Sequence, residues 1–456
     1  MTPLYDALAA RAARDQARFH MPGHKGYPIG ALWGEITAID FTELSDTGDL
    51  YRGGDDGPIR AAERLYAEAY GAGDCLFLTG GSTQGVLAML AAFAHPGDTV
   101  LVDRNAHASV HHALALLDLH PVWLFSQVVE PFGVSGGLPA RTLEMALVAH
   151  PEAACALVTS PTYHGVQSDL VTLSAAARRH GVPLLADAAH GAHLPYVDGQ
   201  VGPTAQGAAA ACLSAHKTLP ALGQAAFLLA ADPRDTGRLR DGARLFGTAS
   251  PSYVLMASLD LARDYMMHQG RTRLAEVVQW ADRWRDQPGG PFLAGAVDPA
   301  RLCLFTGRGV GDAAWLEQAC GVVCEMADAR NVVFLLSALD SAQDLERLSA
   351  ALHALWRDRP PPAVSPALRP PDWPPPFAAL SPRQAFFARH VVCPLAAAAG
   401  RAAARAIAPY PPGVPLVAPG ELIDKNHTEL LYQMGYDGNT PVCVVDEPDL
   451  MKGPRL

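Results

Sequence analysis

The chain has 456 residues, of which 49% are hydrophobic and 18% are charged. This length exceeds one ordinary domain, and the composition is typical of a compact protein with large buried sheets. The formal net charge of −11 argues against a nucleic-acid-binding surface. No run of 18 or more apolar residues is present, so no membrane-spanning helix is expected.

The cysteine pattern indicates a reducing compartment. The cysteines form no CxxC pair, and the chain is far longer than the small secreted domains that disulfides hold together. We therefore expect most of them to be buried thiols in a cytoplasmic protein. Residues 1–16 mix acids and arginines among alanines, without the continuous apolar core of a signal peptide. The eight cysteines are at positions 75, 155, 212, 303, 320, 324, 393 and 443.

Residues 1–70 are expected to form an N-terminal segment of two helices and a loop. Residues 1–18 are rich in alanine and have the amphipathic pattern of a short helix. Residues 19–57 are rich in Gly, Pro, His and Asp, which favours an ordered polar loop. A second helix is predicted from Pro58, a residue suited to the first helical turn, to Tyr70.

Residues 71–285 alternate between strand-like and helical patterns. Most of the apolar runs are separated by Ala- and Leu-rich stretches, which predicts an α/β domain whose mostly parallel sheet has helices on both faces. Ligands of such sheets bind at the carboxyl ends of the strands. A long helical region at about 252–285 leads out of this domain. The strand-like runs are CLFLT, TVLVD, PVWLF, CALVTS, PLLAD, AACLSA and AAFLLA.

The remaining residues are expected to form a smaller α+β domain and a C-terminal segment. Residues 286–358 contain three strand-like runs, RLCLFT, GVVCEMAD and NVVFLLSA, and then the helical run SAQDLERLSAALHALW. Residues 359–376 are too proline-dense for a helix or a strand and are predicted to be a linker. Residues 377–456 begin with a helical pattern and then turn to loops around PYPPGVPLVAPGE.

Lys217 lies directly after the apolar run AACL, in the sequence SAHKT. An apolar neighbourhood lowers the pKa of a lysine, and the neutral amine is the form that makes a Schiff base with a carbonyl compound. Considered alone, Lys217 is explained equally well as a surface lysine beside a turn. Other residues along the chain decide between these interpretations.

Three further segments lie at predicted strand ends. Asp187 ends the run PLLAD, where a buried carboxylate would keep a pyridine nitrogen protonated, although an Asp that caps the next helix is common. The GGST turn at 80–83 precedes a helix, so its hydroxyls and the helix amides suit a phosphate, although any N-cap looks similar. His107 follows TVLVD, and its imidazole suits stacking on a cofactor ring, although a lone His is more often structural.

The order of these segments resembles the fold-type I enzymes that use pyridoxal phosphate (PLP), the aspartate aminotransferase superfamily. The resemblance is closest to the Orn/Lys/Arg decarboxylases, in particular to small bacterial members without the N-terminal wing domain. HMPGHK, NAHxS, HGAH and HKTLPALxQ are together very specific. The shared segments, in collinear order, are FHMPGHKG (19–26), GDLYRGGDDGPIRAAE (48–63), RNAHASV (104–110), SPTYHGVQSDL (160–170), ADAAHGAH (186–193), SAHKTLPALGQAAFL (214–228) and PYPPGVPLVAPGE (409–421).

This resemblance implies a role for each matched residue. Lys217 holds PLP as a Schiff base, Asp187 pairs with the pyridinium, and His107 stacks on the ring. Lys217 or a nearby histidine such as His216 returns a proton to Cα after CO₂ leaves. The remaining cofactor contacts are expected from Gly81, Ser82, Thr83, Ser214 and His216 at the phosphate, and from His190 with Tyr163 or Thr162 at the ring hydroxyl.

The resemblance also implies decarboxylation of a basic amino acid, with arginine favoured over lysine and ornithine. A distal cation requires carboxylate partners, and the candidates, each equally explained as a solvated loop acid, are Glu43, Asp46, Asp49 and Glu421.

The main alternative is an aminotransferase, which would clamp the substrate carboxylate with an arginine such as Arg383, Arg389, Arg401 or Arg405. A catalytically idle PLP-binding regulator is a second alternative, which the intact set of Lys217, Asp187 and His107 disfavours.

Further expectations concern subunits, metals and the pathway. The resemblance implies a homodimer with shared active sites, in which the loop 40–57 crosses between subunits. His190 and His193, or His107, His111 and His112, have helical spacing, but neither set has the HExxH form and we expect no metal site. Three departures from the relatives, namely the GGST turn, Ala188 and the proline-rich linker, leave open a modified substrate and a specialised pathway in place of polyamine biosynthesis.

Overall fold

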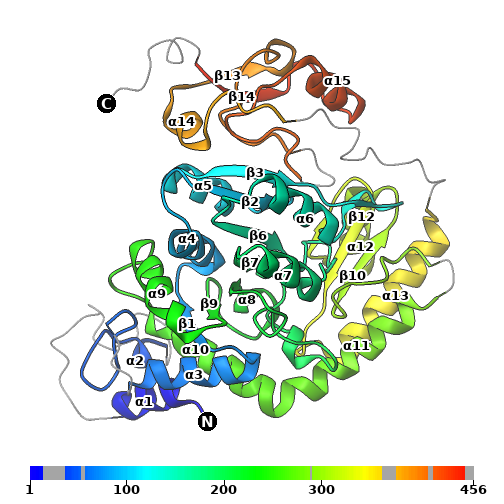
Figure 1. The fold of residues 1–456 in the computed structure, drawn as a ribbon. Coiled ribbons are helices and arrows are strands. Elements are labelled where there is room, and N and C mark those ends of the chain that lie inside the picture. Colours follow the sequence, from blue (N-terminus) through cyan, green and yellow to red (C-terminus); the bar gives the residue numbers. More distant parts are fainter. Residues whose placement is uncertain (14–35, 53–56, 288–289, 362–375, 409–413, 447–456) are drawn as a thin grey trace.

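The computed structural model describes residues 1–13, 36–52, 57–287, 290–361, 376–408 and 414–446 (Figure 1). Several segments singled out in the sequence lie outside these ranges: FHMPGHKG at 19–26, residues 53–56 of the early loop, most of the proline-dense run 359–376, and PYPPG at 409–413. Within the described ranges, no helix has both the length and the apolar character needed to cross a membrane.

A seven-stranded sheet lies at the centre of the described chain, in the order β1-β9-β8-β7-β6-β2-β3. Neighbours are parallel except at β9, which is antiparallel to both β1 and β8. The predicted α/β fold with a mostly parallel sheet is therefore confirmed. Its strands are β1 (Asp74–Leu78), β2 (Thr99–Asp103), β3 (His120–Leu124), β6 (Cys155–Thr159), β7 (Leu184–Asp187), β8 (Ala210–Leu213) and β9 (Ala226–Ala230).

Helices cover both faces of this sheet. Side chains alternate along β1, so that Cys75 and Phe77 join one hydrophobic cluster while Leu76 and Leu78 join another. The first cluster includes side chains of α3 (Pro58–Tyr70), α6 (Ala140–Ala149), α7 (Leu170–Arg179) and α10 (Tyr253–Tyr265). The second includes side chains of α4 (Gly81–Phe93), α5 (Ala108–Leu117) and α9 (Thr236–Leu245).

The N-terminal segment follows local sequence signals closely. Gly57 caps α3, Pro58 occupies its first turn, and Gly71 ends it with a φ of 62°, a conformation that glycine adopts without strain. The predicted helix Pro58–Tyr70 is thus confirmed to the residue. The first helix, α1 (Pro3–Ala12), is shorter than the predicted range 1–18, of which residues 14–18 lie outside the description. A short helix α2 (Ile36–Ile39) follows.

The connection from β8 to β9 is short because these neighbouring strands are antiparallel. It contains one helical turn, α8 (Ala215–Thr218), and returns through Gln224, whose φ is 75°. The backbone N–H of His216 donates to the carbonyl of Ala225 at 3.1 Å, which joins the helical turn to the start of β9. Lys217 therefore lies on a loop that is held by a strand at each end.

The small domain follows a continuous helical stretch. α10 passes through a π-helical turn (Met266–Gly270) into α11 (Arg271–Arg285), as predicted for 252–285. Its antiparallel sheet has the order β10-β12-β11, with β10 (Arg301–Phe305), β11 (Met326–Ala327) and β12 (Asn331–Leu335). The helices α12 (Gly309–Cys320) and α13 (Ala342–Asp358) complete it. The prediction of a strand along all of GVVCEMAD is wrong, because Gly321, with a φ of 65°, ends α12 and only Met326–Ala327 pairs with β12.

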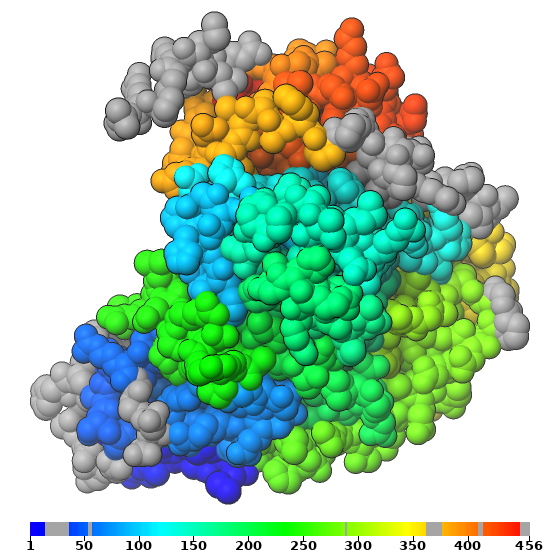
Figure 2. All heavy atoms as spheres, viewed as in Figure 1, coloured from blue at the N-terminus to red at the C-terminus, as the bar shows by residue number. Residues whose placement is uncertain are grey.

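The C-terminal segment lies beyond the β2–β3 edge of the central sheet (Figure 1), and Figure 2 shows its orange and red atoms over the cyan region. α14 (Pro382–Phe387) packs against α5. An antiparallel pair, β13 (His390–Pro394) and β14 (Pro441–Val445), and the helix α15 (Lys425–Gln433) follow. The sequence predicted the initial helix but missed both strands and α15. A small hairpin, β4 (Val128–Val129) with β5 (Val134–Ser135), and 3₁₀ turns at Leu194–Tyr196, Pro233–Asp235 and Leu395–Ala397 complete the described elements.

Candidate active site

The carboxyl ends of five strands bring the predicted residues to one edge of the sheet. β1, β2, β6, β7 and β8 all run in the same direction, so the residues that follow them meet at one edge, where α/β sheets bind their ligands. These residues are Ser82 after β1, His107 after β2, Tyr163 after β6, Asp187 at the end of β7 and Lys217 after β8.

Lys217 and His190 are in direct contact, with 3.0 Å between Nζ and Nε2. Lys217 is half-buried, and burial lowers the pKa of its ammonium group. The Asp187 carboxylate opposes this lowering of the pKa, while the positive charge of Arg301 adds to it. A lowered pKa increases the fraction of neutral amine, which is the nucleophilic form that covalent attachment to a carbonyl compound requires.

Asp187 supplies a buried carboxylate at the same edge. It is 3% exposed and accepts hydrogen bonds from the backbone N–H of Ala189 at 3.2 Å and from the thiol of Cys212 at 3.8 Å. Its charge acts on the pKa of Lys217 and also on that of His107. A buried anion in this position fits a protonated pyridine nitrogen.

The turn before α4 forms a cradle of hydroxyls and helix amides. The hydroxyl of Ser214 donates to Oγ of Ser82 at 2.8 Å, which brings β8 and the first turn of α4 together. Gly81 has a φ of 71°, and Gly85 touches β8 so closely that a Cβ there would lie 2.7 Å from Cβ of Cys212. This pairing of hydroxyls with a helix N-terminus has the donors that a phosphate group requires, and the phosphate role of Ser82 and Ser214 stays a prediction. Thr83, in the same turn, is exposed.

Two histidines of the predicted site are fixed by the backbone. Nδ1 of His107 accepts the N–H of Ser109 at 3.1 Å, so its imidazole caps α5 while the side chain stays exposed. Desolvation by the surrounding protein lowers the pKa of His107. Nδ1 of His216 lies 3.1 Å from the carbonyl of Ala225, which holds that ring toward β9.

Tyr163, rather than Thr162, faces His190. The two rings of Tyr163 and His190 meet edge to face, with centroids 4.9 Å apart. The Tyr163 hydroxyl donates to Oε1 of Glu325 at 2.8 Å, and burial together with this carboxylate raises the pKa of Tyr163 to about 12. Thr162 is 1% exposed, and its Oγ1 accepts the N–H of Val166 within its own turn.

Two residues of the small domain reach this site and were missed in the sequence. Arg301 at the start of β10 is 2% exposed, and its Nη1 lies 3.4 Å from Nδ1 of His190. Glu325 lies just before β11, is exposed, and joins the site through Tyr163. An arginine that opens an apolar strand, as in DPARLCLF, is the signal that would have marked Arg301.

Glu421 is part of a buried ion pair. Its two oxygens accept from Nη1 and Nη2 of Arg104 at 2.7 Å each, and Oε2 also accepts the N–H of Ala418 at 2.7 Å. Arg104 donates further to the carbonyls of Pro415 at 2.7 Å and Leu416 at 3.0 Å. This geometry corrects the expectation that Glu421 binds the substrate, because its carboxylate is already committed to joining the C-terminal segment to β2.

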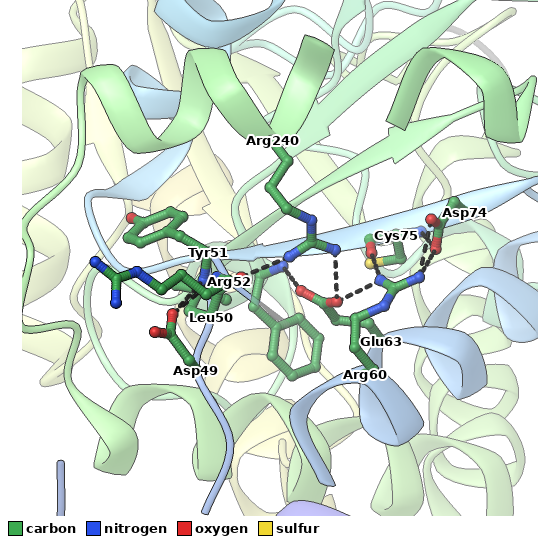
Figure 3. Close-up of polar contacts among 10 residues, drawn as sticks. Asp49, Leu50, Tyr51, Arg52, Arg60, Glu63, Asp74, Cys75 and Arg240 are labelled. Carbon is green, nitrogen blue, oxygen red and sulfur yellow. Dashed lines mark hydrogen bonds and ion pairs between the residues drawn. The ribbon is translucent and has the colours of Figure 1, made fainter. Parts of the chain in front are cut away.

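The early loop is held against α3, β1 and α9 (Figure 3). Oδ1 of Asp49 accepts the N–H groups of Tyr51 and Arg52 at 2.9 Å each, so one oxygen of this carboxylate shapes its own turn. Arg240 donates to the carbonyl of Leu50 and to the buried Glu63. Of the other predicted acids, Glu43 is exposed and accepts from the Thr42 hydroxyl at 2.6 Å, whereas Asp46 pairs with Arg11.

Three of the four arginines considered as a carboxylate clamp have contacts elsewhere. Arg383 donates to the carbonyl of Leu116 at 3.0 Å, at the end of α5. Arg389 pairs with Asp446, and Arg401 donates to the carbonyl of Val445, both beside β14. These contacts are structural and do not favour the aminotransferase alternative.

Most of the histidines weighed as metal ligands have other partners. His193 lies 2.7 Å from Asp298 through Nε2, and the ring of His111 packs against Trp123. Across the described part of the chain, no three His, Cys, Asp or Glu side chains are grouped in a way that would hold a metal ion. All eight cysteines are free, and five of them are buried.

Comparison with known proteins identifies the family. Residues 2–290 match the model of the Orn/Lys/Arg decarboxylase major domain, and residues 376–435 match the C-terminal domain of the same family. The arginine decarboxylase of Bacillus subtilis is 30% identical over 97% of this chain and 95% of its own length. The uncharacterized protein YaaO of the same organism is 32% identical over 95% and 94%.

A solved structure supports the fold assignment. The Francisella novicida lysine decarboxylase LdcF superposes with a TM-score of 0.80 at 20% identity, covering 98% of this chain and 81% of that one. At this identity the likeness shows the fold. The two matched domains confirm the family that the motifs predicted. The chain belongs to the Orn/Lys/Arg decarboxylase family of PLP-dependent enzymes.

Proposed function

We propose that this chain decarboxylates arginine, with PLP bound covalently to Lys217, and releases CO₂ and the corresponding amine. The observation that carries the proposal is the amine of Lys217, whose pKa is lowered, beside the buried Asp187 and on the same strand edge as the Ser82–Ser214 hydroxyl pair. The choice of arginine is supported by full-length relatives named arginine decarboxylase, among them the Bacillus subtilis protein.

Each residue of the site has a task in this proposal. PLP supplies an electron sink for the bond that breaks at Cα. Ser82, Ser214 and the first turn of α4 would hold its phosphate, and Asp187 would keep its ring nitrogen protonated. The exposed imidazole of His107 would stack on the ring, and Thr83 and His216 would add contacts at the phosphate. Lys217, with His190 beside it, returns a proton to Cα after CO₂ has left.

Glu325 is our candidate for the carboxylate that binds the distal guanidinium. It is exposed, so a substrate can reach it, and the Tyr163 hydroxyl donates to Oε1 at 2.8 Å and orients it. The negative charge of Glu325 acts to raise the pKa of Lys217, and the same charge would attract the guanidinium of a substrate. A guanidinium prefers two oxygens at once, and a carboxylate held by one hydroxyl retains that capacity.

The reaction is tested by supplying arginine, lysine and ornithine separately to the purified chain with PLP, while CO₂ and amine are measured. We expect amine from arginine above all, and we expect Lys217→Ala to lose both turnover and the visible absorbance of covalently bound PLP. Lys425→Ala, which alters an exposed lysine of α15, is the matched control. A keto acid formed with an acceptor, in place of amine and CO₂, would contradict the proposal.

The substrate carboxylate is tested with Glu325→Gln. Loss of a charge-assisted hydrogen bond is worth about 1.5–3 kcal/mol, so KM for arginine should rise at least tenfold while kcat changes much less. Glu317→Gln, an exposed glutamate of α12, should leave KM unchanged. An unchanged KM in Glu325→Gln would remove Glu325 from this role.

We further propose a cytoplasmic homodimer in polyamine biosynthesis, in which Glu43 and Asp49 of the early loop act in the partner's site. The free cysteines support a reducing compartment. If Glu43 acts across the interface, a mixture of inactive Lys217→Ala and Glu43→Gln subunits regains activity, because one site in each hybrid is unaltered. If activity does not return on mixing, Glu43 does not act across the interface.

A further inference from the structure

Arg301 reaches the candidate active site from the small domain. Its guanidinium donates to the carbonyl of Tyr163 at 2.6 Å and lies 3.4 Å from Nδ1 of His190. Its Nε is 3.5 Å from the carboxylate of Asp298, in the turn before β10. Gly165, with a φ of 95°, leaves room for the arginine stem, since a Cβ there would lie 3.1–3.2 Å from three of its carbons. The arginine is therefore held from several sides.

The hydrogen-bond donors of Arg301 determine which ring nitrogen of His190 carries the proton. A guanidinium carries only N–H donors and does not lose its charge in proteins, so the Nδ1 that faces it can only accept. The single proton of a neutral imidazole is then on Nε2, which points at Nζ of Lys217 across 3.0 Å. An ammonium group also carries only donors. The contact is therefore a hydrogen bond only when Lys217 is a neutral amine.

We propose that Arg301 is a positioning residue that holds His190 as its Nε2–H tautomer and thereby favours the neutral amine of Lys217. This inference rests on the proposed function, in which Lys217 is the attachment point of PLP. Arg301 acts in two ways: it occupies the acceptor of His190, and its fixed positive charge disfavours a second and a third cation nearby.

The pKa directions agree with this geometry. Burial is the largest cause that lowers the pKa of His190 far below its usual range, and Arg301 is the next. Burial also lowers the pKa of Lys217, which Asp187 opposes and Arg301 reinforces. The titratable and charged groups that face this pair come from several elements: Asp187 of β7, Cys212 of β8, Arg301 of β10, Glu325 before β11, His107 before α5 and His193 after β7.

A first test requires no substitution in the network. Nitrogen-15 NMR of the full chain freed of PLP reports the histidine tautomers, and His190→Gln identifies the signal that belongs to His190. We expect a neutral His190 with its proton on Nε2 at pH 7. A proton on Nδ1, or a charged imidazolium, would overturn the proposal whatever the catalytic outcome.

A second test measures the pH dependence of PLP capture, followed as the rate at which the visible absorbance of covalently bound PLP appears. Arg301→Met removes the charge and the donors but keeps a long stem, and should shift the pKa of this profile up by about one unit. Capture then slows about tenfold below the pKa and matches the unaltered protein above it. Arg301→Lys keeps the charge and a donor, and should restore most of the profile.

The outcomes separate a positioning role from a structural one. Uniformly slower capture at every pH, with no shift of the profile, would mean that Arg301 only supports the fold and would refute the proposal. If Arg301→Met does not fold, the tautomer measurement on the unaltered protein still decides. If Lys217→Ala captures PLP covalently, the proposed function fails instead, and the NMR result stands separately.

Discussion

Replacement of Glu421 by Gln tests whether this buried residue is structural, as its contacts show, or a substrate ligand, as its place in the sequence first indicated. The side chain is 3% exposed, and its partner Arg104 is 1% exposed. The substitution keeps the shape and one acceptor but removes the negative charge that the guanidinium faces. Arg104 is then left as an uncompensated cation in a buried site.

The expected cost follows from the geometry of the pair. Loss of one partner of a buried ion pair costs about 3–5 kcal/mol. Glutamine can still accept one hydrogen bond, and the carbonyls of Pro415 and Leu416 still hold the guanidinium, so we expect the lower value. For a cooperative unit of about 150–250 residues, roughly 3 kcal/mol corresponds to a fall of about 6–12 °C in Tm.

The assay is thermal unfolding of the full chain, together with KM for arginine measured well below Tm. Glu429→Gln alters an exposed glutamate of α15 in the same segment and should leave Tm within about 1 °C, because exposed substitutions change stability little. An unchanged Tm combined with a raised KM for arginine would refute the structural role of Glu421 and would indicate that it binds the substrate.

Three other predictions address the sheet edge and α9. Gly85→Ala should destabilise the chain by about 1–3 kcal/mol and weaken PLP binding, because the new Cβ would lie 2.7 Å from Cys212 and push the first turn of α4 away from β8. The matched Gly237→Ala on α9, where a Cβ meets no atom within 4 Å, should stabilise it by about 0.4–1 kcal/mol, as measured by urea unfolding. Asp103 is buried, and desolvation raises its pKa to about 6, so the folded state binds this proton more tightly than the unfolded state and the stability due to it is lost as the pH rises through 6. Relative to the unaltered chain, Asp103→Asn should therefore gain about 1 kcal/mol of unfolding free energy between pH 5 and pH 8, and a constant difference across that range would contradict the assigned pKa.

The strands of the central sheet could be predicted from the sequence because the patterns that mark them are local. Each apolar run became a strand within two residues of the predicted range, and Pro58 and Gly71 set the ends of α3. Residues that follow parallel strands must share an edge, so the grouping of Asp187 and Lys217 was also accessible from the motifs. The strands β13 and β14 were missed because each begins or ends with proline and they pair across 46 intervening residues.

Contacts distant along the chain were beyond the reach of the sequence patterns. Arg301 meets His190 across 111 positions, and Tyr163 meets Glu325 across 162. Neither pair has a spacing or a periodicity that a linear pattern detects. Glu421 was wrongly predicted to bind the substrate for the same reason, because its partner Arg104 is 317 positions away. No local signal distinguishes a solvated loop acid from one member of a buried ion pair.

The reversed direction of β9 has a consequence for the order of events during folding. Because β8 and β9 are adjacent and antiparallel, the loop with Lys217 is closed by contacts between residues near in sequence, whereas the parallel neighbour of β8, β7, requires a longer crossover. Contacts of low sequence separation form at the smallest entropic cost. We expect this loop to close early, so that Lys217 is already oriented before any cofactor binds.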